Sequence, residues 1–500
     1  MMQTVKLSES LSCQQVAAVA NGAQLELAPD AVERIAHGRA IVDALVARGI
    51  KGYGINTGVG ALCDVIVDRD QQQALSHNIL MSHACGVGGP LGLVETRAIM
   101  AAQINNFAHG ASGVRPEIVN ALIALLNADC IPVVPSRGSV GYLTHGATIG
   151  LVLIGHGHAM HDGVRITGAQ ACAKIGMEPL RLQAKEGLSL VNGTPCATGM
   201  ACLALWRLSS LLDWADLAAA MTAENLGCQM TAFAPNALGL RKSDGLQKVG
   251  ETLRTYLQDS PMLAASVGKR TQDPLSVRSV PHVHGTVRDA LRDVIATVTR
   301  ELESVTDNPA VLGAPETPEV HSQAHAVGAA LALSMDNLGV AVAELAVISE
   351  RRIDRMVNPL VSGLPAFLVR ESGVCSGYMI AQYTAVSLVS ENRRLAAPAS
   401  LDGGITSALQ EDMLTHATPA AWKALTILDN LELVLGIELL AAAQAYDLQG
   451  DVAKPAVRTG KFYGDIRKSI PPYRDDRPMQ NDFDAIRAFM KVNVINQEID

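Results

Sequence analysis

The sequence predicts an all-α protein built around a bundle of long helices. Residues 197–229 contain no proline, and alanine and leucine dominate there. Apolar residues recur in this stretch at helical spacing, at Leu205, Leu208, Leu212, Ala215 and Ala219. Residues 322–356 and 420–448 have the same character, which is typical of a long-helix bundle. Strand signals are weak, because the short apolar run 130–134 contains Pro132 and fits a buried loop equally well.

The chain of 500 residues is too long for one compact core and suggests roughly two or three domains, or one large helical assembly. We expect a mostly helical region with active-site loops over residues 1–196. A central long-helix bundle follows over residues 197–450. Residues 451–500 are expected to form an irregular segment with a short helix, because residues 454–478 are rich in Pro, Arg and Lys.

Composition excludes several classes of function. Hydrophobic residues make up 48% of the chain and charged residues 18%, so a large core can form. Aromatic residues make up only 3% and the net charge is −9, which argues against nucleic acid or an anionic membrane surface as a partner. Two stretches without charge, Gly138–His161 and Gly187–Trp206, are long enough to span a membrane. Their histidines, glycines and Pro195 instead indicate buried protein interior around a site.

Nine cysteines are dispersed along the chain without a CxxC pair. Such an odd set indicates reduced thiols in a cytoplasmic protein, and the N-terminus has no apolar segment typical of a signal peptide. His156, His158 and His161 form an HxHxxH pattern. Only Asp162 stands near it as a further ligand, so we expect a loop or helix end here and no metal site.

Several polar strings lie in apolar or glycine-rich surroundings. In chain order they are Tyr53-Gly-Ile-Asn-Thr-Gly58, Met81-Ser-His-Ala84, Gly138-Ser-Val-Gly141, Glu186-Gly-Leu-Ser-Leu-Val-Asn-Gly-Thr194, Gln272-Asp-Pro-Leu-Ser-Val-Arg278, Ser304-Val-Thr-Asp-Asn-Pro309, Ile348-Ser-Glu-Arg-Arg352, Ser362-Gly-Leu-Pro365 and Gln410-Glu-Asp412. Together, from about residue 30 to 450 and in the right order, they resemble histidine ammonia-lyase and its aromatic amino acid lyase relatives. The resemblance implies a nearly all-α long-helix bundle and a homotetramer whose active sites combine loops from three subunits.

The family uses an electrophile, methylidene-imidazolone, made from an Ala-Ser-Gly triad that follows the Gly-Ser-Val-Gly string. Here Gly138–Gly141 is followed by Tyr142-Leu-Thr-His-Gly-Ala147, and Leu151-Val-Leu-Ile-Gly155 then matches the family three positions early. In Ser139-Val140-Gly141 the central valine cannot lose water, and Leu143-Thr144-His145 lacks a small third residue. Ala111-Ser112-Gly113 aligns with an ordinary Ser-Gly of the family. We therefore expect no such cofactor.

Two further departures point the same way. The family's tyrosine in the Gln272–Arg278 string is replaced by Leu275, and its Asn-Phe-His string is replaced by Gln323, Ala324 and His325. In the family this tyrosine and phenylalanine help to form or flank the electrophile.

The resemblance also implies roles for single residues. Tyr53 matches the catalytic base, although the same residue type is also common as a buried, hydrogen-bonded tyrosine. Arg278 matches the arginine that binds the substrate carboxylate with paired donors, and a plain ion pair with Asp273 is the alternative. Asn192 and Gln272 match polar residues that line the substrate site, or they stabilise turns.

His83 matches the position that selects the substrate side chain, and Glu411 matches an acid that recognises the amine or imidazole. A satisfied core histidine and a buried ion pair are the respective alternatives. Tyr142, Thr144 and His145 are new groups where the electrophile would stand. Tyr142 and His145 are candidate catalytic residues, and filling of space after a deletion is the other interpretation.

A phenol alone accelerates a reaction by about 10²–10⁴-fold, which is small for ammonia loss from an ordinary amino acid. We therefore expect a lyase that works without the electrophile, by elimination or addition, or an isomerase or cyclase, acting on a small amino-acid-like carboxylate. An ordinary histidine or aromatic amino acid ammonia-lyase is the first alternative. A catalytically inactive relative that binds a ligand or partner is the second.

Overall fold

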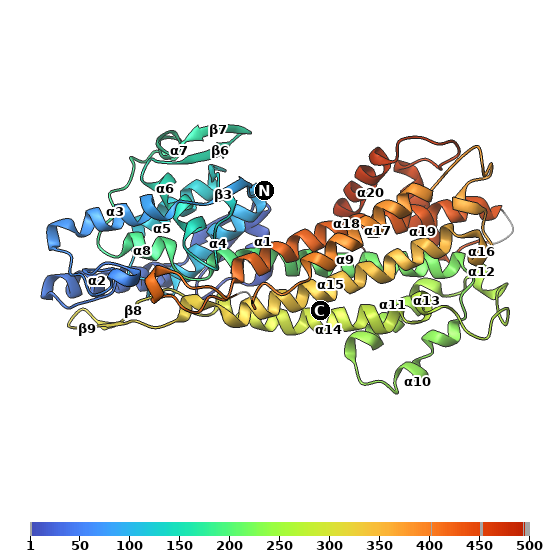
Figure 1. Cartoon of the computed structure of the whole chain (residues 1–500), viewed down its shortest axis with the longest axis horizontal. Helices are drawn as coiled ribbons and strands as arrows, with labels where there is room; N and C mark the ends of the chain where they lie inside the picture. The colour runs from blue at the N-terminus through green and yellow to red at the C-terminus, as the bar shows by residue number, and fades with distance from the viewer. Residues whose placement is uncertain (1–2, 402, 451–453, 494, 496–500) are drawn as a thin grey trace. The chain divides into compact units, whose positions relative to one another are not determined.

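The computed structural model describes residues 3–401, 403–450, 454–493 and 495. Its secondary structure is dominated by helices, with short strands mainly in the N-terminal part (Figure 1). The chain divides into two compact units. Unit 1 comprises residues 1–206, 294–336 and 398–425, and unit 2 comprises residues 207–293, 337–397 and 426–500.

Four long helices contribute residues to both units. They are α9 (Pro195–Asn225), α14 (Val280–Leu302), α15 (Ala329–Val357) and α18 (Ala417–Gln449). The sequence predicted α9, α15 and α18, and the all-α long-helix class is confirmed. It did not predict α14, whose apolar residues are diluted by many charged ones.

In unit 1 the helix α4 is buried along almost its whole length. The helices are α1 (Cys13–Ala20), α2 (Pro29–Arg48), α3 (Gln72–His83), α4 (Leu93–Ala108), α5 (Pro116–Asn127), α6 (Thr144–Leu153), α7 (Gly168–Lys174) and α8 (Glu186–Val191). The local sequence explains their ends. In α2, for example, Pro29 opens the first turn and Asp30 follows it, and Gly49 ends the helix at a φ of +67°.

The strands of unit 1 form small sheets. β1 (Thr4–Leu7) pairs with β2 (Gln24–Leu27) in parallel, and β3 (Val87–Pro90) pairs with β5 (Pro135–Arg137) antiparallel. β4 (Ile131–Pro132) and β7 (Val164–Thr167) flank β6 (His158–His161), and β8 (Ala310–Ala314) pairs with β9 (Thr317–His321). The ambiguous run at 130–134 thus contributes a strand of two residues.

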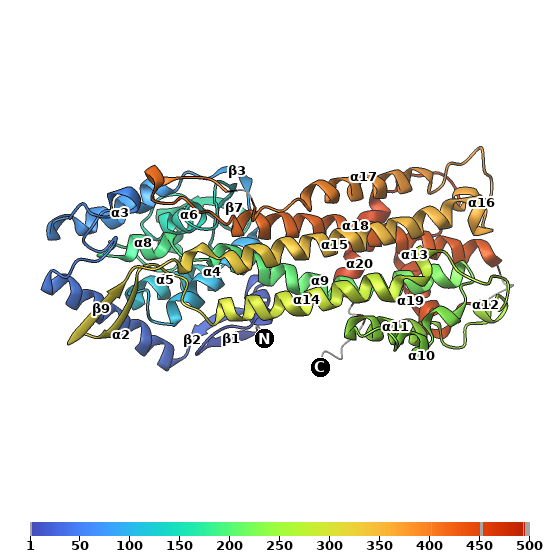
Figure 2. The same cartoon turned by 60° about the horizontal axis from the view of Figure 1, so that its bottom comes forward.

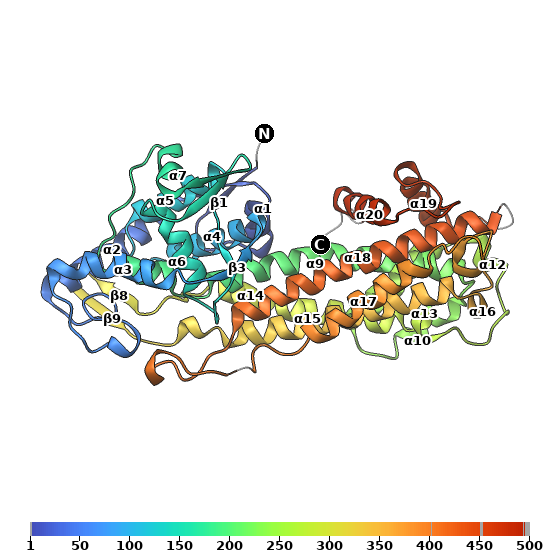
Figure 3. The same cartoon turned by 45° about the horizontal axis from the view of Figure 1, so that its top comes forward.

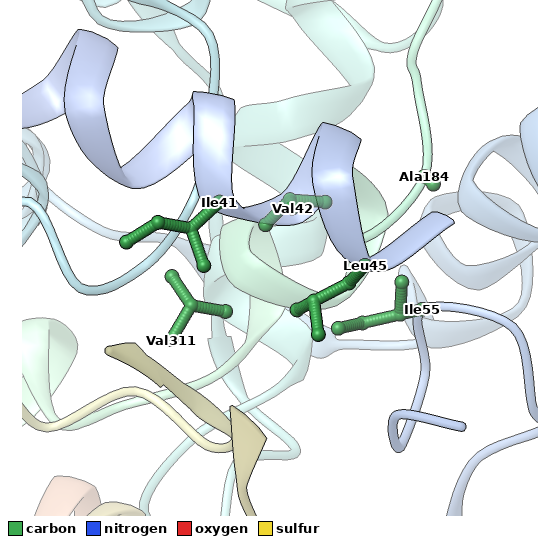
Figure 4. Packing of buried hydrophobic residues seen from close by; sticks show 6 residues of the cluster. All are labelled: Ile41, Val42, Leu45, Ile55, Ala184 and Val311. Atoms are coloured by element: carbon green, nitrogen blue, oxygen red, sulfur yellow. The ribbon is translucent and has the colours of Figure 1, made fainter. Parts of the chain in front are cut away.

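One hydrophobic cluster of unit 1 is shown in Figure 4. Ile41, Val42 and Leu45 project from one face of α2 and meet Ile55, Ala184 and Val311 from three other segments. Ile55 belongs to the Tyr53 string, so burial of this apolar residue anchors the loop that carries Tyr53. Complete burial of such a side chain contributes about 1.5–3 kcal/mol.

Unit 2 combines its share of the long helices with α10 (Pro235–Leu238), α11 (Asp244–Leu257), α12 (Pro261–Ala264), α13 (Leu275–Arg278), α16 (Pro359–Ser362), α17 (Met379–Leu395), α19 (Val457–Ser469) and α20 (Gln480–Val492). Figure 2 shows α17, α15 and α14 running alongside one another there. A buried ionic network joins the long helices. Arg352 binds Glu438 at 2.6 Å, and Asp216 accepts from Arg288 at 2.6 Å and contacts His284 at 2.7 Å.

The C-terminal part is more regular than expected. Residues 457–469 form α19, in which Thr459 and Ile466 are buried, so the expected irregular segment contains a helix (Figure 3). Buried Glu224 of α9 holds this segment, because it accepts hydrogen bonds from the Thr459 hydroxyl and the Ala456 amide at 2.6 and 2.7 Å.

The two helical stretches 186–225 and 325–357 are long and apolar enough to cross a membrane. Their most apolar windows are 100% and 67% buried inside the protein. This burial agrees with the interpretation of Gly187–Trp206 as interior.

Candidate active site

Tyr53 lies in the loop after α2 and is partly buried. Its phenolic oxygen accepts a hydrogen bond from the Gly60 amide at 2.8 Å. Gly54 adopts a φ of +62°, and a Cβ there would clash with the side chain of Leu188 in α8. The glycine is therefore required for the close approach that brings Tyr53 to α8.

Glu411 lies in the loop before α18, where its backbone pairs with that of Thr406. One carboxylate oxygen of Glu411 accepts from the Thr406 hydroxyl and from the Tyr142 phenol, each at 3.3 Å. These contacts bring the loop of Glu411 to the turn at Tyr142.

The turn at Tyr142 is tightly constrained. The Leu143 amide donates to the Val191 carbonyl at 2.8 Å, and the Thr418 hydroxyl donates to the Gly141 carbonyl at 2.9 Å. Leu143 has a φ of +82° and a ψ of −81°, a backbone conformation that a leucine rarely adopts. Strain of this kind gathers at functional sites, where surrounding contacts maintain it.

His83 is the last residue of α3, and its Nδ1 lies 3.0 Å from the Ser82 hydroxyl. Burial lowers the pKa of His83, and the charge of Glu411 acts in the opposite direction. Burial also favours the neutral form of Tyr53 and Tyr142, so it raises the pKa of both phenols, and the charge of Glu411 raises both further. These mutual influences show that Tyr53, His83 and Tyr142 all lie within electrostatic reach of Glu411.

His145 takes a different position from Tyr142. It is 2% exposed in the first turn of α6, and burial lowers its pKa to about 4. Its Nδ1 lies 3.5 Å from the Thr144 hydroxyl, and its Nε2 has no hydrogen-bond partner among the described residues. Of the two candidates in this turn, Tyr142 is the one that contacts Glu411.

Asn192 follows α8 directly and has a fixed side chain. Its Nδ2 donates to the Asn308 carbonyl at 2.6 Å, and its Oδ1 accepts from the Gly193 amide at 2.9 Å. The next residue, Thr194, donates its amide to the Thr306 hydroxyl at 3.1 Å. The polar strings of residues 186–194 and 304–309 are therefore two halves of one hydrogen-bonded structure.

Gln272 and Arg278 lie in unit 2, with Arg278 at the end of α13. With the amide of Gln272 oriented so that its oxygen faces the guanidinium, Arg278 Nη1 donates to it at 2.7 Å. Asp273 instead pairs with Arg270 at 3.2 Å and accepts from the Gln229 amide. Among the described residues Arg278 has no acidic partner, which disfavours the interpretation as an ordinary ion pair.

The predicted site residues thus fall into two groups. Unit 1 contains Tyr53, His83, Tyr142, His145, Asn192 and Glu411, and unit 2 contains Gln272 and Arg278. Sequence reasoning missed the Gly60 amide, Thr406 and Ser407. The glycine-rich Gly58-Val-Gly60 run was a signal for the first, whereas nothing in the sequence relates Ser407 to a loop 346 positions earlier.

The residues around Tyr142 do not fit the methylidene-imidazolone group. The turn offers Tyr142-Leu143-Thr144, whose central leucine has no hydroxyl to eliminate, and Leu143-Thr144-His145, whose third residue is not small. The remaining Ala-Ser-Gly triplet begins at Ala111, and the carbonyl of its Ser112 accepts from Lys185 Nζ at 2.7 Å and from the Ser189 hydroxyl at 2.9 Å. That triplet is therefore held in a buried structural network.

No group of three or more metal-ligating side chains occurs among the residues that the structure describes. In the HxHxxH segment, His161 Nδ1 contacts the Cys130 thiol at 3.5 Å, and His158 Nδ1 contacts Arg165 at 3.2 Å. These histidines have separate partners.

Known proteins resemble the chain over nearly its whole length. The model of the aromatic amino acid lyase family matches residues 11–468. A histidine ammonia-lyase of Symbiobacterium thermophilum is 44% identical, with 97% of this chain and 96% of that protein covered. One of Anaeromyxobacter sp. is 42% identical, with 98% and 99% covered. The crystal structure of histidine ammonia-lyase from Trypanosoma cruzi matches with a TM-score of 0.90 at 34% identity and covers 98% of this chain and 94% of that one.

These similarities correct the functional prediction made from the sequence. The expectation of an electrophile-independent elimination, addition, isomerisation or cyclisation of a small amino-acid-like carboxylate is wrong, because relatives at 42–44% identity over nearly the full chain are histidine ammonia-lyases. The prediction was wrong because it gave the departures at Tyr142, Leu275 and Ala324 more weight than the much larger number of positions that match the family. The finding supports the alternative of an ordinary histidine ammonia-lyase. The match of the family model to residues 11–468 and the relatives at 42–44% identity show that the chain belongs to the aromatic amino acid lyase family.

Proposed function

We propose that the protein is a histidine ammonia-lyase, which releases ammonia from L-histidine and leaves the α,β-unsaturated imidazole acid. The observation that carries the proposal is the similarity to histidine ammonia-lyases over 97–98% of the chain. The site agrees with it, because His83 and Glu411 offer polar contacts that an imidazole ring uses as both donor and acceptor.

Tyr53 is the proposed base that takes a proton from the carbon next to the imidazole. In unit 1 its surroundings oppose this role, because burial and Glu411 raise the pKa of the phenol. A cation close to Tyr53 would counteract both effects, since an opposite charge within about 4–6 Å favours the ionised form. Arg278 carries such a positive charge on its guanidinium, which also offers paired donors to the substrate carboxylate.

We propose that Gln272 and Arg278 reach the site of Tyr53 from another copy of the chain, within a homotetramer. Exposed apolar side chains support this assembly. Val340 and Val347 of α15 are seven residues apart and lie on one helix face, and Ile380 and Tyr383 are exposed on α17. Unpartnered apolar faces of this kind mark protein contact surfaces.

A separate proposal concerns the turn at Tyr142, which we expect to remain uncyclised. The intact mass of the purified protein should equal the mass of the encoded chain. A deficit of two water molecules would contradict this proposal about the turn and would leave the proposed reaction untouched.

The proposed function is tested by incubating the purified protein with L-histidine. Ammonia and the absorbance of the conjugated acid should appear in equal amounts. The Tyr53→Phe variant is the matched control, because it removes one hydroxyl and preserves the ring. Release of ammonia from L-tyrosine or L-phenylalanine but not from L-histidine would overturn the assignment.

A further inference from the structure

Two loops of unit 1 meet beside the phenol of Tyr53. The first contains the short 3₁₀ turn Gly60–Leu62, and the second contains the turn Ser407–Leu409. The Gly60 amide donates to the Tyr53 oxygen at 2.8 Å, and the next amide, of Ala61, donates to the Ser407 hydroxyl oxygen at 3.0 Å. Of these two consecutive amides, that of Gly60 therefore binds the proposed base and that of Ala61 binds Ser407.

The backbone at Ser407 is unusual. Ser407, Ala408 and Leu409 have φ angles of 50°, 49° and 75°, so three successive residues with side chains adopt the left-handed region. Each such residue costs roughly 1–2 kcal/mol relative to right-handed backbone. The turn is maintained by the backbone pairing of Thr406 with Glu411 and by a bond from the Gln410 amide to the Ser407 carbonyl at 3.0 Å.

The fit between the two loops is close. Gly60 has a φ of +58°, and a Cβ at this position would clash with the Ser407 hydroxyl oxygen. The serine thus occupies space that only a glycine leaves free, and its oxygen meets the Ala61 amide directly. Strained turns that the surroundings maintain in this way are typical of functional sites.

We infer that Ser407 is a positioning residue for the proposed base. By accepting from the Ala61 amide, Ser407 fixes the preceding peptide so that the Gly60 amide points at the phenolic oxygen of Tyr53. A fixed amide donor stabilises the phenolate more than the phenol, because the ionised oxygen is the stronger acceptor. Ser407 therefore acts on Tyr53 through the Ala61 and Gly60 amides in this arrangement.

The other groups that act on Tyr53 oppose ionisation. Glu411 from the loop before α18 and Cys63 after the 3₁₀ turn both raise the pKa of Tyr53, and Tyr142 lies within electrostatic reach. Among the described residues, the Gly60 amide is the contact that favours the phenolate. Loss of its orientation should therefore raise the pKa of Tyr53 without changing the charges around it.

The inference rests on the proposed role of Tyr53 as base, and its first test is the pH profile of kcat/KM in Ser407→Ala. This profile reports the pKa of the base in the free enzyme. We expect the rising limb of the profile to move by about one pH unit to higher pH. At pH values on this limb kcat/KM should be about tenfold lower than in the original protein, and the plateau should be unchanged. A purely structural defect would lower the plateau and leave the limb in place, which would overturn the inference.

A second readout does not depend on activity. The phenolate absorbance of Tyr53, isolated as the difference from a Tyr53→Phe background, should titrate at higher pH in Ser407→Ala. If the enzyme proves inactive on L-histidine, this titration still decides the role of Ser407, and the two failures remain distinguishable.

Two further variants control for the strained backbone. Ser407→Gly also lacks the hydroxyl but tolerates positive φ, so it should show the same shift even if Ser407→Ala folds poorly. Ala408→Gly relaxes the same turn and keeps the hydroxyl, so the pKa of Tyr53 should stay unchanged. An unshifted titration in Ser407→Gly, or an equal shift in Ala408→Gly, would contradict the inference.

Discussion

The carboxylate of Glu411 interacts with several other side chains of the candidate site. Glu411 bonds to Tyr142 and Thr406 and influences the pKa of Tyr53 and His83. Because Glu411 opposes ionisation of both phenols, each of them should be protonated in an isolated chain at neutral pH. For the proposed role of Tyr53 as base, we therefore expect a positive charge to be supplied, and Arg278 is the proposed source.

The role of Tyr53 is tested by Tyr53→Phe. The variant loses the hydroxyl that accepts from Gly60 and keeps the shape of the ring, so we expect turnover to fall by about 10²–10⁴-fold with the fold intact. Steady-state kinetics on L-histidine measures this, with circular dichroism as the check of folding. Full activity in a folded variant would place the base elsewhere, and Tyr142 would become the leading candidate.

Arg278→Lys tests the carboxylate contact. Lysine keeps the charge but loses the paired donors of the guanidinium, so KM for L-histidine should rise more than kcat falls. Gln272→Glu serves as a contrast, because it places a carboxylate beside Arg278 and should compete with the substrate for it. An unchanged KM in both variants would exclude Arg278 from substrate binding.

At the scale of elements, the sequence predicted the long helices that have strong apolar periodicity. The long apolar helices α9, α15 and α18 lie within or close to the stretches 197–229, 322–356 and 420–448 in which they were predicted. Contacts between distant segments were not predictable, because no local pattern relates Ser407 to Ala61 or Tyr142 to Glu411. The helix α19 was missed because its burial depends on Glu224, which lies in a helix far away in the sequence.

The element-scale prediction concerns the buried pair that holds α8 to the Ser304–Pro309 string. Lys185 and Asp307 are both fully buried, and Lys185 Nζ lies 2.9 Å from Asp307 Oδ2. Lys185→Met removes one charge and leaves the other unpaired in the interior, which should cost about 3–5 kcal/mol of the free energy of unfolding. Chemical denaturation measures this loss.

The double variant Lys185→Met with Asp307→Leu is the matched control for that pair. It removes both charges, so most of the stability should return, because a buried pair replaced by apolar groups is often close to neutral. If the single variant were as stable as the original protein, the pair would have no part in joining the two strings.

At the scale of the whole molecule, the two groups of site residues lie in different units of the chain. We expect a homotetramer in which Tyr53 of one subunit works with Arg278 of another. Light scattering should report a tetramer at micromolar concentration. Mixed tetramers of Tyr53→Phe and Arg278→Ala subunits, refolded together, should regain activity that neither variant has alone.

Complementation in the mixed tetramers distinguishes a site shared between subunits from a site within one subunit. If one subunit supplied both residues, every site in the mixture would carry a defect and no activity would return. A stable monomer with full activity would contradict the shared site directly.

We propose that this chain eliminates ammonia from L-histidine. The most direct measurement is proton NMR of L-histidine incubated with the purified protein, with ammonia determined in parallel. We predict vinyl proton signals of the imidazole acid and one equivalent of ammonia, at rates that Tyr53→Phe lowers by about 10²–10⁴-fold. Unchanged L-histidine, under conditions in which the folded tetramer turns over another amino acid, would contradict the claim.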